Sequence, residues 1–440
     1  MSLTTTAYRE FLARKAAGLP QHGDPVDPAE VHPMLHPWQR QIVAWAVRTG
    51  RAALWADTGL GKSFMQLEWA RLSTPAAGRA LIVAPLAVCQ QTAREASRIG
   101  IDARYVRGDG QADGPGVWIT NYEMIEHFDA ARLDAVTLDE SSILKDVTSK
   151  TRDLLIAHFA PVRRRLACSA TPAPNDVAEL ANHAEFLGVA SRREMLSTYF
   201  VHDQDGWRPK GHARGPMFRW MSGWAVALRR PSDIGYSDDG YVLPELRIVP
   251  HLLPVDLEVD GQLFATSLGG VGGRAKVRRD TLQARCRRAA DLVAAESDQP
   301  WLLWCGLNDE ADALARMIPG AVNVHGSMTP EQKAELLLGF ADGDIRYLIT
   351  KPGIAAFGLN WQHCARMAFV GLSDSYEQYY QAIRRCYRYG QARPVHVHII
   401  LSDLEGQIAA NVSRKERDAA RLTGELVAQM RATTTWSRAA

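Results

Sequence analysis

The feature that most constrains this chain is an eight-residue loop, Ala56-Asp57-Thr58-Gly59-Leu60-Gly61-Lys62-Ser63, between a short apolar run and a helical pattern. Its two glycines let backbone N–H groups turn toward an anion without a clash from a Cβ atom. Lys62 adds a mobile positive charge, and Ser63 adds a hydroxyl oxygen of the kind that binds magnesium. The helix expected after the loop directs its positive end to the same point. The loop therefore predicts a site for a nucleoside phosphate in a strand–loop–helix unit.

The hydrophobic pattern alternates between strands and helices on either side of a central interruption. Short apolar runs recur between segments with helical spacing, which predicts an α/β fold with parallel sheets covered by helices on both faces. The expected strands are 52–55, 80–83, 117–120, 135–138, 165–168, 301–305, 321–324, 347–350, 367–370 and 395–401. Residues 172–250 break the alternation, and residues 261–273 contain five glycines. We therefore expect two lobes joined by an insertion and a flexible connection.

The length and charge of the chain agree with two lobes. Its 440 residues suit two domains, and a net charge of only +2 excludes a uniformly basic nucleic-acid coat protein. The predicted division is an N-terminal leader (1–30), lobe 1 with the phosphate loop (31–190), a mostly helical insertion and linker (191–275), lobe 2 (276–405), and a C-terminal helix and tail (406–440).

Cysteine spacing and hydropathy indicate the environment of the chain. The six cysteines include no C-x-x-C pair, so a zinc ribbon or a redox motif is not expected. The N-terminus lacks the charged-then-apolar pattern of a signal peptide. The longest apolar stretch, 80–89, contains Pro85 and has about half the length that a bilayer requires. We predict a reduced, cytoplasmic protein without a membrane partner.

Two acidic residues, Asp139 and Glu140, follow the expected strand 135–138. The carboxyl ends of parallel strands line the crevice in which α/β folds bind nucleotides. There Asp139 would hold magnesium, and Glu140 would orient and deprotonate the attacking water. An acidic surface turn would have the same composition. Asp139 lies 77 residues beyond Lys62, and the intervening strands can return the acids to the phosphate loop, which favours the site over the turn.

A basic segment of the second lobe, 381–391, carries candidate catalytic arginines. Arg385 and Arg388 are three residues apart, so we expect them to share one face of a helix. A planar and permanently charged guanidinium group suits the dispersed charge of a phosphoryl transition state. A solvated basic helix is the alternative, because Arg384 is also charged.

The order of these segments resembles helicase superfamily two, and within it the Swi/Snf-type ATPases, over roughly residues 35–402. The resemblance rests on Pro37-Trp38-Gln39, the phosphate loop, residues 119–124, the acid box Asp139-Glu140-Ser141-Ser142 with its trailing Lys145, Ser169-Ala170-Thr171-Pro172, residues 175–187, Leu228-Arg229-Arg230 with Leu243-Pro244, residues 351–360 and residues 381–391. Ala56 is typical of helicase-type loops, whereas Ser142 stands where the DEAD/DEAH-box-like pattern usually has histidine. Compact versions of this kind resemble proteins of bacteriophages and prophages, which implies a bacterial or phage-infected cell.

The resemblance implies two tandem RecA-like lobes that use ATP and magnesium (Mg²⁺). The implied catalytic residues are Lys62, Asp139, Glu140, Arg385 and Arg388, and the implied metal ligands are Ser63 and Asp139. The implied nucleotide-binding residues are Gln39, Asp57, Thr58, Gly59, Leu60, Gly61, Lys62, Ser63, Gly358 and Gln381. The implied nucleic-acid contacts are Pro85, Asn121, Tyr122, Gly326 and Thr350.

The resemblance favours a monomeric translocase on double-stranded DNA that contacts mainly the backbone. Two alternatives stay open, namely a strand-separating helicase on DNA or RNA and an ATP-gated DNA clamp that does not move. The Trp-rich segment around Trp220 and Trp224 would serve a strand-separating enzyme as a wedge. The basic stretch 274–288 is either a DNA-facing patch or a solvated surface, and Trp38 either contacts adenine or packs in the core.

Overall fold

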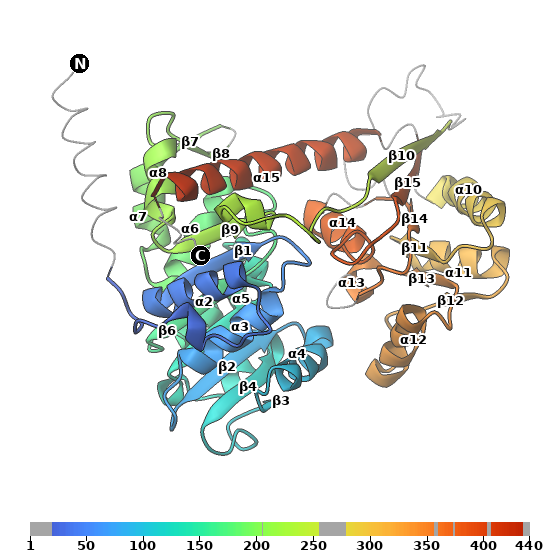
Figure 1. Cartoon of the computed structure of the whole chain (residues 1–440). Helices are drawn as coiled ribbons and strands as arrows, with labels where there is room; N and C mark the ends of the chain where they lie inside the picture. Colours follow the sequence, from blue (N-terminus) through green and yellow to red (C-terminus); the bar gives the residue numbers. More distant parts are fainter. Residues whose placement is uncertain are drawn as a thin grey trace. The chain divides into compact units, whose positions relative to one another are not determined.

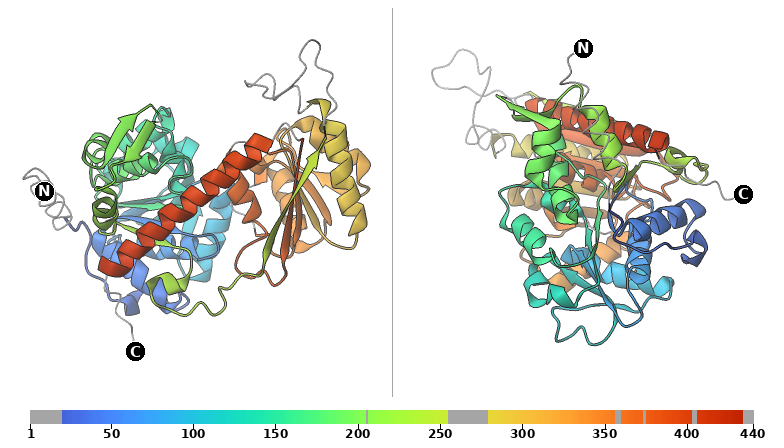
Figure 2. Two further views of the ribbon diagram at one scale, coloured as in Figure 1. Left: turned by 90° about the horizontal axis from the view of Figure 1, so that it is seen from above. Right: turned by 90° about the vertical axis from the view of Figure 1, so that its left-hand side faces the viewer.

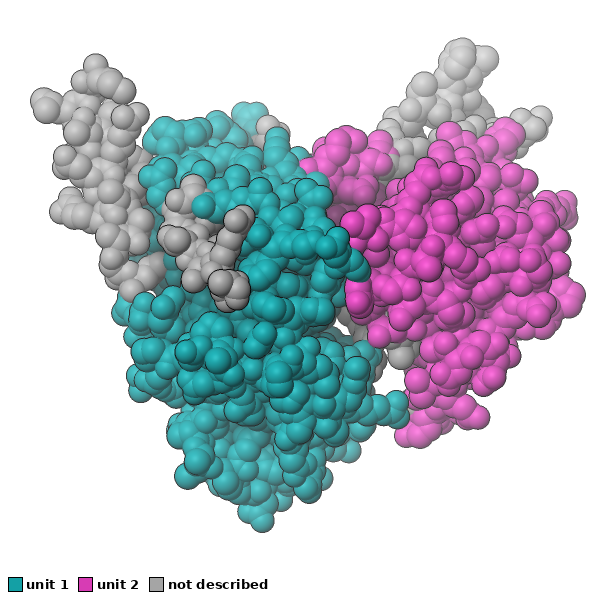
Figure 3. Space-filling view, viewed as in Figure 1, with its two compact units in different colours: residues 1–241, 418–440 teal, residues 242–417 magenta. Residues whose placement is uncertain are grey.

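The structure is a computed structural model that describes residues 20–204, 206–254, 279–355, 360–372, 375–402 and 406–433. It divides into two compact units, which Figure 3 shows in different colours. Unit 1 comprises residues 1–241 and 418–440, and unit 2 comprises residues 242–417. Each unit is built around its own parallel sheet (Figure 1). The predicted fold class, α/β with parallel sheets in two lobes, is therefore confirmed.

Unit 1 contains a seven-stranded parallel sheet in the order β3-β4-β2-β5-β6-β1-β9. Its strands are β1 (Arg51–Ala56), β2 (Arg79–Ala84), β3 (Ala103–Tyr105), β4 (Gly116–Asn121), β5 (Ala135–Asp139), β6 (Arg164–Cys168) and β9 (Ala225–Leu228). Its helices are α2 (Pro37–Thr49), α3 (Lys62–Leu72), α4 (Leu86–Arg98), α5 (Lys150–His158), α6 (Leu180–Leu187), α7 (Arg192–Tyr199) and α8 (Arg214–Met221). A small antiparallel hairpin joins β7 (Phe200–Asp203) and β8 (Gly206–Pro209). The central strands are buried on both faces, which explains their nearly continuous apolar sequences.

Unit 2 contains a six-stranded parallel sheet in the order β10-β15-β14-β11-β13-β12. Its strands are β10 (Leu246–Leu253), β11 (Trp301–Cys305), β12 (Ala321–Asn323), β13 (Tyr347–Thr350), β14 (Arg366–Val370) and β15 (Val395–Ser402). Its helices are α10 (Leu282–Ala295), α11 (Asn308–Met317), α12 (Pro330–Asp342), α13 (Pro352–Ala355) and α14 (Tyr376–Ile383); α15 (Gly406–Thr433) begins in this unit and ends in unit 1. Helices cover both faces of this sheet (Figure 2). All five side chains of β11 are accordingly buried, although successive ones point to opposite faces.

Six short 3₁₀ helices connect the described elements. They are Pro28–Glu30, Tyr122–His127, Ala130–Arg132, Ser141–Lys145, Val177–Glu179 and Pro231–Ile234. The segment Ser141–Lys145 matters most for function, because it follows directly on the acids at the end of β5.

The region between the expected lobes contributes a strand to each sheet. β9 pairs with β1 in unit 1, and β10 pairs with β15 in unit 2. Residues 191–275, predicted as one insertion, are thus divided between the units as far as they are described. β10 escaped prediction because Pro250 interrupts its pattern, and an edge strand tolerates a residue without an N–H donor.

The two tryptophans of the expected wedge belong to the core of unit 1. Trp220 and Trp224 are 3% and 1% exposed and lie edge to face, 5.4 Å between ring centroids. The idea that they act as a strand-separating wedge is therefore wrong, because neither ring reaches the surface. Trp38 is also buried and packs edge-on against Tyr241. In this structure Trp38 therefore packs in the core, which was the alternative to an adenine contact.

Burial also governs the other side chains singled out from the sequence. All six cysteines are buried and free, and burial raises the pKa of the Cys89 thiol to about 12. Arg285 of the basic stretch is fully buried and forms a 2.6 Å ion pair with Glu310, so it cannot belong to a DNA-facing patch. Residues 274–278 of that stretch lie outside the described residues. Among the described helices, none is long and apolar enough to cross a bilayer.

A pair of histidines, the buried His398 and the half-buried His251, links the edge strand β10 to β15 and should make unit 2 sensitive to acid. His251 Nε2 lies 2.9 Å from His398 Nδ1, and the two rings stack. Burial, followed by the charge of His251, lowers the pKa of His398 from 6.5 to about 4. The other charged groups that act on this pair are His396, Arg366, Glu296 and Arg288.

The sign of the expected effect follows from proton binding. Below pH 6.5 the unfolded chain takes up a proton at His398 more readily than the folded chain, so stability is lost as the pH falls toward about 4. We expect the melting temperature of unit 2 to fall between pH 7.5 and pH 5, and to fall less in His398→Asn, which keeps a hydrogen-bonding group but cannot titrate. An equal fall in both proteins, followed by differential scanning calorimetry, would remove His398 as the cause.

Candidate active site

The phosphate loop connects β1 to α3 as predicted from its sequence. Gly59 and Gly61 have φ values of 85° and 75°, in the left-handed region that glycine adopts without strain. Lys62 is the first residue of α3, and its Nζ donates to the carbonyl oxygens of Ala56, at 2.7 Å, and Asp57, at 3.4 Å. The ammonium group therefore lies over its own loop at the N-terminus of a helix, where an anion is favoured.

Neighbouring side chains stiffen the loop. Gln39 in α2 is 5% exposed; its Nε2 donates to the Leu60 carbonyl at 2.9 Å, and its Oε1 accepts from the His36 N–H at 2.8 Å. A Cβ atom on Gly61 would lie only 2.4 Å from Gln39 Nε2, so this approach requires glycine. Inside the loop, Asp57 Oδ1 accepts from the Thr58 N–H at 2.7 Å. The resemblance implied that Gln39 binds the nucleotide, and in this structure its amide braces the loop.

The acids lie at the carboxyl end of β5. Asp139 is 6% exposed, and burial and the charge of Glu140 raise its pKa to about 7, although the charge of Lys62 acts in the opposite direction. The Lys62 ammonium group therefore lies close enough to Asp139 for its charge to act on that carboxyl group. Among the described non-glycine residues, Glu140 alone has a positive φ, 55°. Such a conformation costs on the order of 1–3 kcal/mol and is typical of functional sites.

This set of groups fits a magnesium nucleotide. The loop and Lys62 suit phosphate oxygens, whereas the Ser63 hydroxyl and the Asp139 carboxylate offer the hard oxygen ligands that magnesium prefers. Lys62, Ser63 and Glu140 are each half-buried, so they remain open to a ligand. All of these groups belong to unit 1.

The nucleic-acid candidates of unit 1 lie at strand ends beside the acid box. Pro85 precedes α4, and Asn121 ends β4. Asn121 accepts from the Tyr105 hydroxyl at 2.8 Å and donates to Glu123. The buried Tyr122 hydroxyl donates to the Asp139 carbonyl at 2.5 Å. The side chains of Asn121 and Tyr122 are therefore used inside unit 1, where Tyr122 supports the acid.

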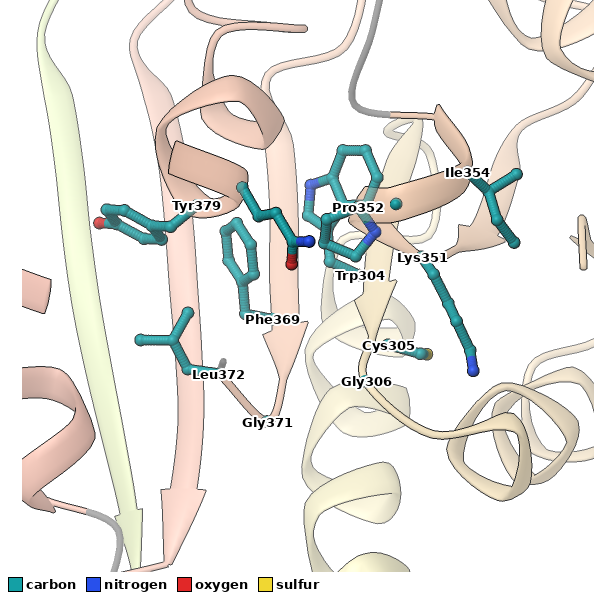
Figure 4. Close-up of a pocket in the computed structure, with 12 residues that line it drawn as sticks. Trp304, Cys305, Gly306, Lys351, Pro352, Ile354, Phe369, Gly371, Leu372 and Tyr379 are labelled. Atoms are coloured by element: carbon teal, nitrogen blue, oxygen red, sulfur yellow. The ribbon is translucent and has the colours of Figure 1, made fainter. Parts of the chain in front are cut away.

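Gly326, a nucleic-acid candidate of unit 2, lines one of the cavities of this unit. This cavity, of about 360 Å³, is lined by Asn308, Ala311, Asp312, Asn323, Val324, His325, Gly326, Ser327 and Lys351. The Thr350 hydroxyl donates to the carbonyl of Val324, one of the lining residues, at 3.1 Å. A second cavity, of about 230 Å³, is lined by Trp304, Lys351 and Phe369, which Figure 4 labels. Gln378 also lines it. Gly358, a predicted nucleotide-binding residue, lies outside the described residues.

The candidate arginines follow α14 and do not share a helical face. The prediction of one helix is wrong, because α14 ends at Ile383. The carbonyl of Arg385 accepts from the Trp361 N–H at 2.9 Å, which removes an acceptor that a continuing helix would need. Arg385 is 5% exposed, and its guanidinium group donates to the Gln381 side chain at 3.1 Å. Arg388 is half-buried.

Comparison with known proteins identifies the second lobe. Residues 286–390 match the family model of the helicase conserved C-terminal domain. Unit 2 thus carries a helicase-type C-terminal domain, which indicates a nucleic-acid-dependent ATPase. The matched segment begins in α10, ends just beyond α14, and includes Arg385 and Arg388.

One solved structure resembles the whole chain at low sequence identity. The structure titled "Sulfolobus solfataricus SWI2/SNF2 ATPase core in complex with dsDNA" is similar, with 16% identity and a TM-score of 0.44. The match covers 94% of this chain and all of that one. Among curated proteins, no sequence match was found.

Two residues that contact the segment Ser141–Lys145 were not predicted from the sequence. Asn182 and His183 of α6 bond to the 3₁₀ helix after Glu140. His183 lies 42 residues from its partner Ser141, so no local pattern marks the contact. The helical stretch 175–187 was the one available signal, and it does not show which of its side chains turn toward the acids.

Proposed function

We propose that this chain is an ATP-driven motor that moves along double-stranded DNA. The observation that carries the proposal is that the phosphate loop and Asp139 both lie at carboxyl ends of parallel strands of the unit 1 sheet, β1 and β5, where the charge of Lys62 acts on the buried carboxyl group. A phosphate loop beside a strand-end acid suits ATP hydrolysis. The helicase conserved C-terminal domain of unit 2 links that hydrolysis to nucleic acid.

The residues of unit 1 divide the work of hydrolysis among them. Lys62 and the loop amides bind the phosphates, and Ser63 and Asp139 would hold magnesium, which neutralises charge on the phosphate oxygens. Glu140 orients a water molecule and takes its proton. Asp139 must be ionised to bind a cation, and the nearby Lys62 charge favours that form. Unit 2 contributes Arg385 and Arg388, whose fixed charge stabilises the transition state.

The burial of Trp220 and Trp224 favours movement on an intact duplex over strand separation. A strand-separating enzyme needs an element that blocks one strand, and the sequence offered Trp220 and Trp224 for that purpose. Both rings are buried in the core of unit 1. Backbone contacts suffice for stepping along DNA, because stepping does not require base readout.

We expect duplex DNA to stimulate ATP turnover more than single-stranded DNA or RNA do. With ATP, the protein should displace a triplex-forming third strand and leave a forked duplex paired. The measurements are a turnover assay with the four conditions in parallel (no nucleic acid, single-stranded DNA, duplex DNA and RNA) and a gel assay of both substrates in one buffer.

The remaining outcomes separate the alternatives. Fork unwinding with an intact triplex would favour a strand-separating helicase. Duplex-stimulated turnover without displacement of either strand would favour an ATP-gated clamp. Lys62→Ala is the control on the same substrates. Because this variant should not hydrolyse ATP, any strand that it displaces is displaced without ATP hydrolysis.

A further inference from the structure

We infer that His183 is a positioning residue for ATP hydrolysis, which holds the general base Glu140 in its left-handed conformation through the Ser141 hydroxyl. The inference rests on the proposed function. It begins with the backbone of Glu140, which has φ 55° and ψ 52°. A non-glycine residue does not hold this conformation unless its surroundings fix it. The groups that fix the following residues therefore determine where the Glu140 carboxylate points.

Side chains of helix α6 hydrogen-bond to both ends of the segment Ser141–Lys145. At its start, His183 Nε2 lies 3.2 Å from Ser141 Oγ, and both residues are completely buried. At its end, Asn182 Nδ2 donates to the carbonyl of Leu144 at 2.8 Å and to that of Lys145 at 3.1 Å. Two adjacent side chains of one helix thus fix the segment that begins immediately after Glu140.

His183 also contacts the strand that carries the phosphate loop. Its ring lies edge-on to Trp55, 5.5 Å between centroids. Trp55 is the penultimate residue of β1, directly before Ala56 and the loop. One imidazole therefore touches both the acid box and the base of the phosphate loop, so it fixes the distance between the proton acceptor and the phosphates.

The imidazole is neutral at physiological pH. Burial lowers the pKa of His183 to about 4, against a backbone carbonyl of Glu179 that raises it. A neutral ring can hydrogen-bond to Ser141 without placing a positive charge behind Glu140. It therefore positions the base without weakening it.

The test compares Ser141→Ala, His183→Leu and His183→Gln by steady-state turnover and by binding of a fluorescent ADP analogue. We expect the first two to lower kcat by about tenfold to a hundredfold, the usual consequence of a displaced catalytic group. The KM for ATP and the ADP affinity should change little, because the loop and Lys62 are intact. His183→Gln, which retains a hydrogen-bonding group at the position of Nε2, should recover part of the loss.

Matched controls separate positioning from folding. Ser73→Ala removes another buried serine hydroxyl of unit 1, at the end of α3, and should leave kcat unchanged. The double variant Ser141→Ala/His183→Leu should be no slower than the worse single variant, because both changes break one contact. If His183→Leu fails to fold, Ser141→Ala decides alone.

Three results would overturn the inference. They are wild-type kcat in Ser141→Ala, multiplicative losses in the double variant, and losses of kcat that match losses of folded protein in thermal melts. Failure of the proposed function looks different, since the wild-type protein would then not hydrolyse ATP under any condition.

Discussion

Replacing Lys62 with alanine should abolish ATP turnover and leave unit 1 folded. The side chain is half-buried, and its ammonium group bonds only to carbonyls of its own loop, at 2.7 Å and 3.4 Å, among the contacts resolved for it. The change therefore removes no core packing. It does remove the cation expected on the phosphates, for which we expect a loss of at least about a hundredfold in kcat, as for other preorganised charge-stabilising groups. A turnover assay and circular dichroism measure the two effects.

Lys210 provides a matched control for this experiment. Its Nζ also donates to two backbone carbonyls of unit 1, those of Ser197 at 2.8 Å and Thr198 at 3.2 Å, but it lies outside the phosphate loop. Lys210→Ala should hydrolyse ATP normally. Equal inactivation of both variants would mean that the lysines act by bracing the backbone, and unchanged turnover in Lys62→Ala would remove the phosphate-loop interpretation.

The sequence predicted those parts of the fold whose burial leaves a local pattern. β2 and β11 are buried on both faces, so their residues are apolar without interruption and were assigned as strands. β3 has three residues and exposes Arg104, and β10 contains Pro250, so neither carries that pattern. Both are edge strands, which need less apolar surface than central strands do.

The candidate site divides in the same way. Its phosphate loop and strand-end acids follow from local sequence and from the rule that parallel strands end at one edge. The contacts that fix these groups come from distant segments, and spacing does not reveal them. Trp361 takes the carbonyl of Arg385 and ends α14 early, and His183 reaches Ser141 from another helix. Helical spacing therefore predicted a helix that runs past the end of α14. The residue that binds the Arg385 carbonyl lies 24 positions away in the sequence, so spacing does not reveal it.

Replacing Arg388 with alanine should slow ATP hydrolysis by about 10³–10⁵-fold, the range for arginine fingers in phosphoryl transfer, with ATP binding nearly normal. Arg385→Ala should show the same kinetic loss and a lower melting temperature of unit 2. The difference arises because Arg385 is buried and bonded to Gln381, at 3.1 Å, whereas Arg388 is half-buried. Single-turnover hydrolysis, binding of a fluorescent ATP analogue and calorimetry measure the three quantities.

Two further variants, Arg388→Lys and Arg393→Ala, test whether the effect is specific to the guanidinium group of Arg388. Arg388→Lys keeps the charge but loses the planar fork, so it should recover little of the rate if the guanidinium group stabilises the transition state. Arg393→Ala removes another arginine of unit 2, which donates to Gln299 at 2.9 Å and to the His363 carbonyl, and should leave hydrolysis unchanged. If Arg388→Ala loses ATP binding in proportion to turnover, the arginine stabilises bound ATP and not specifically the transition state. Full activity in Arg388→Lys would show that charge alone is required, and the lack of a shared helical face would then no longer matter for the chemistry.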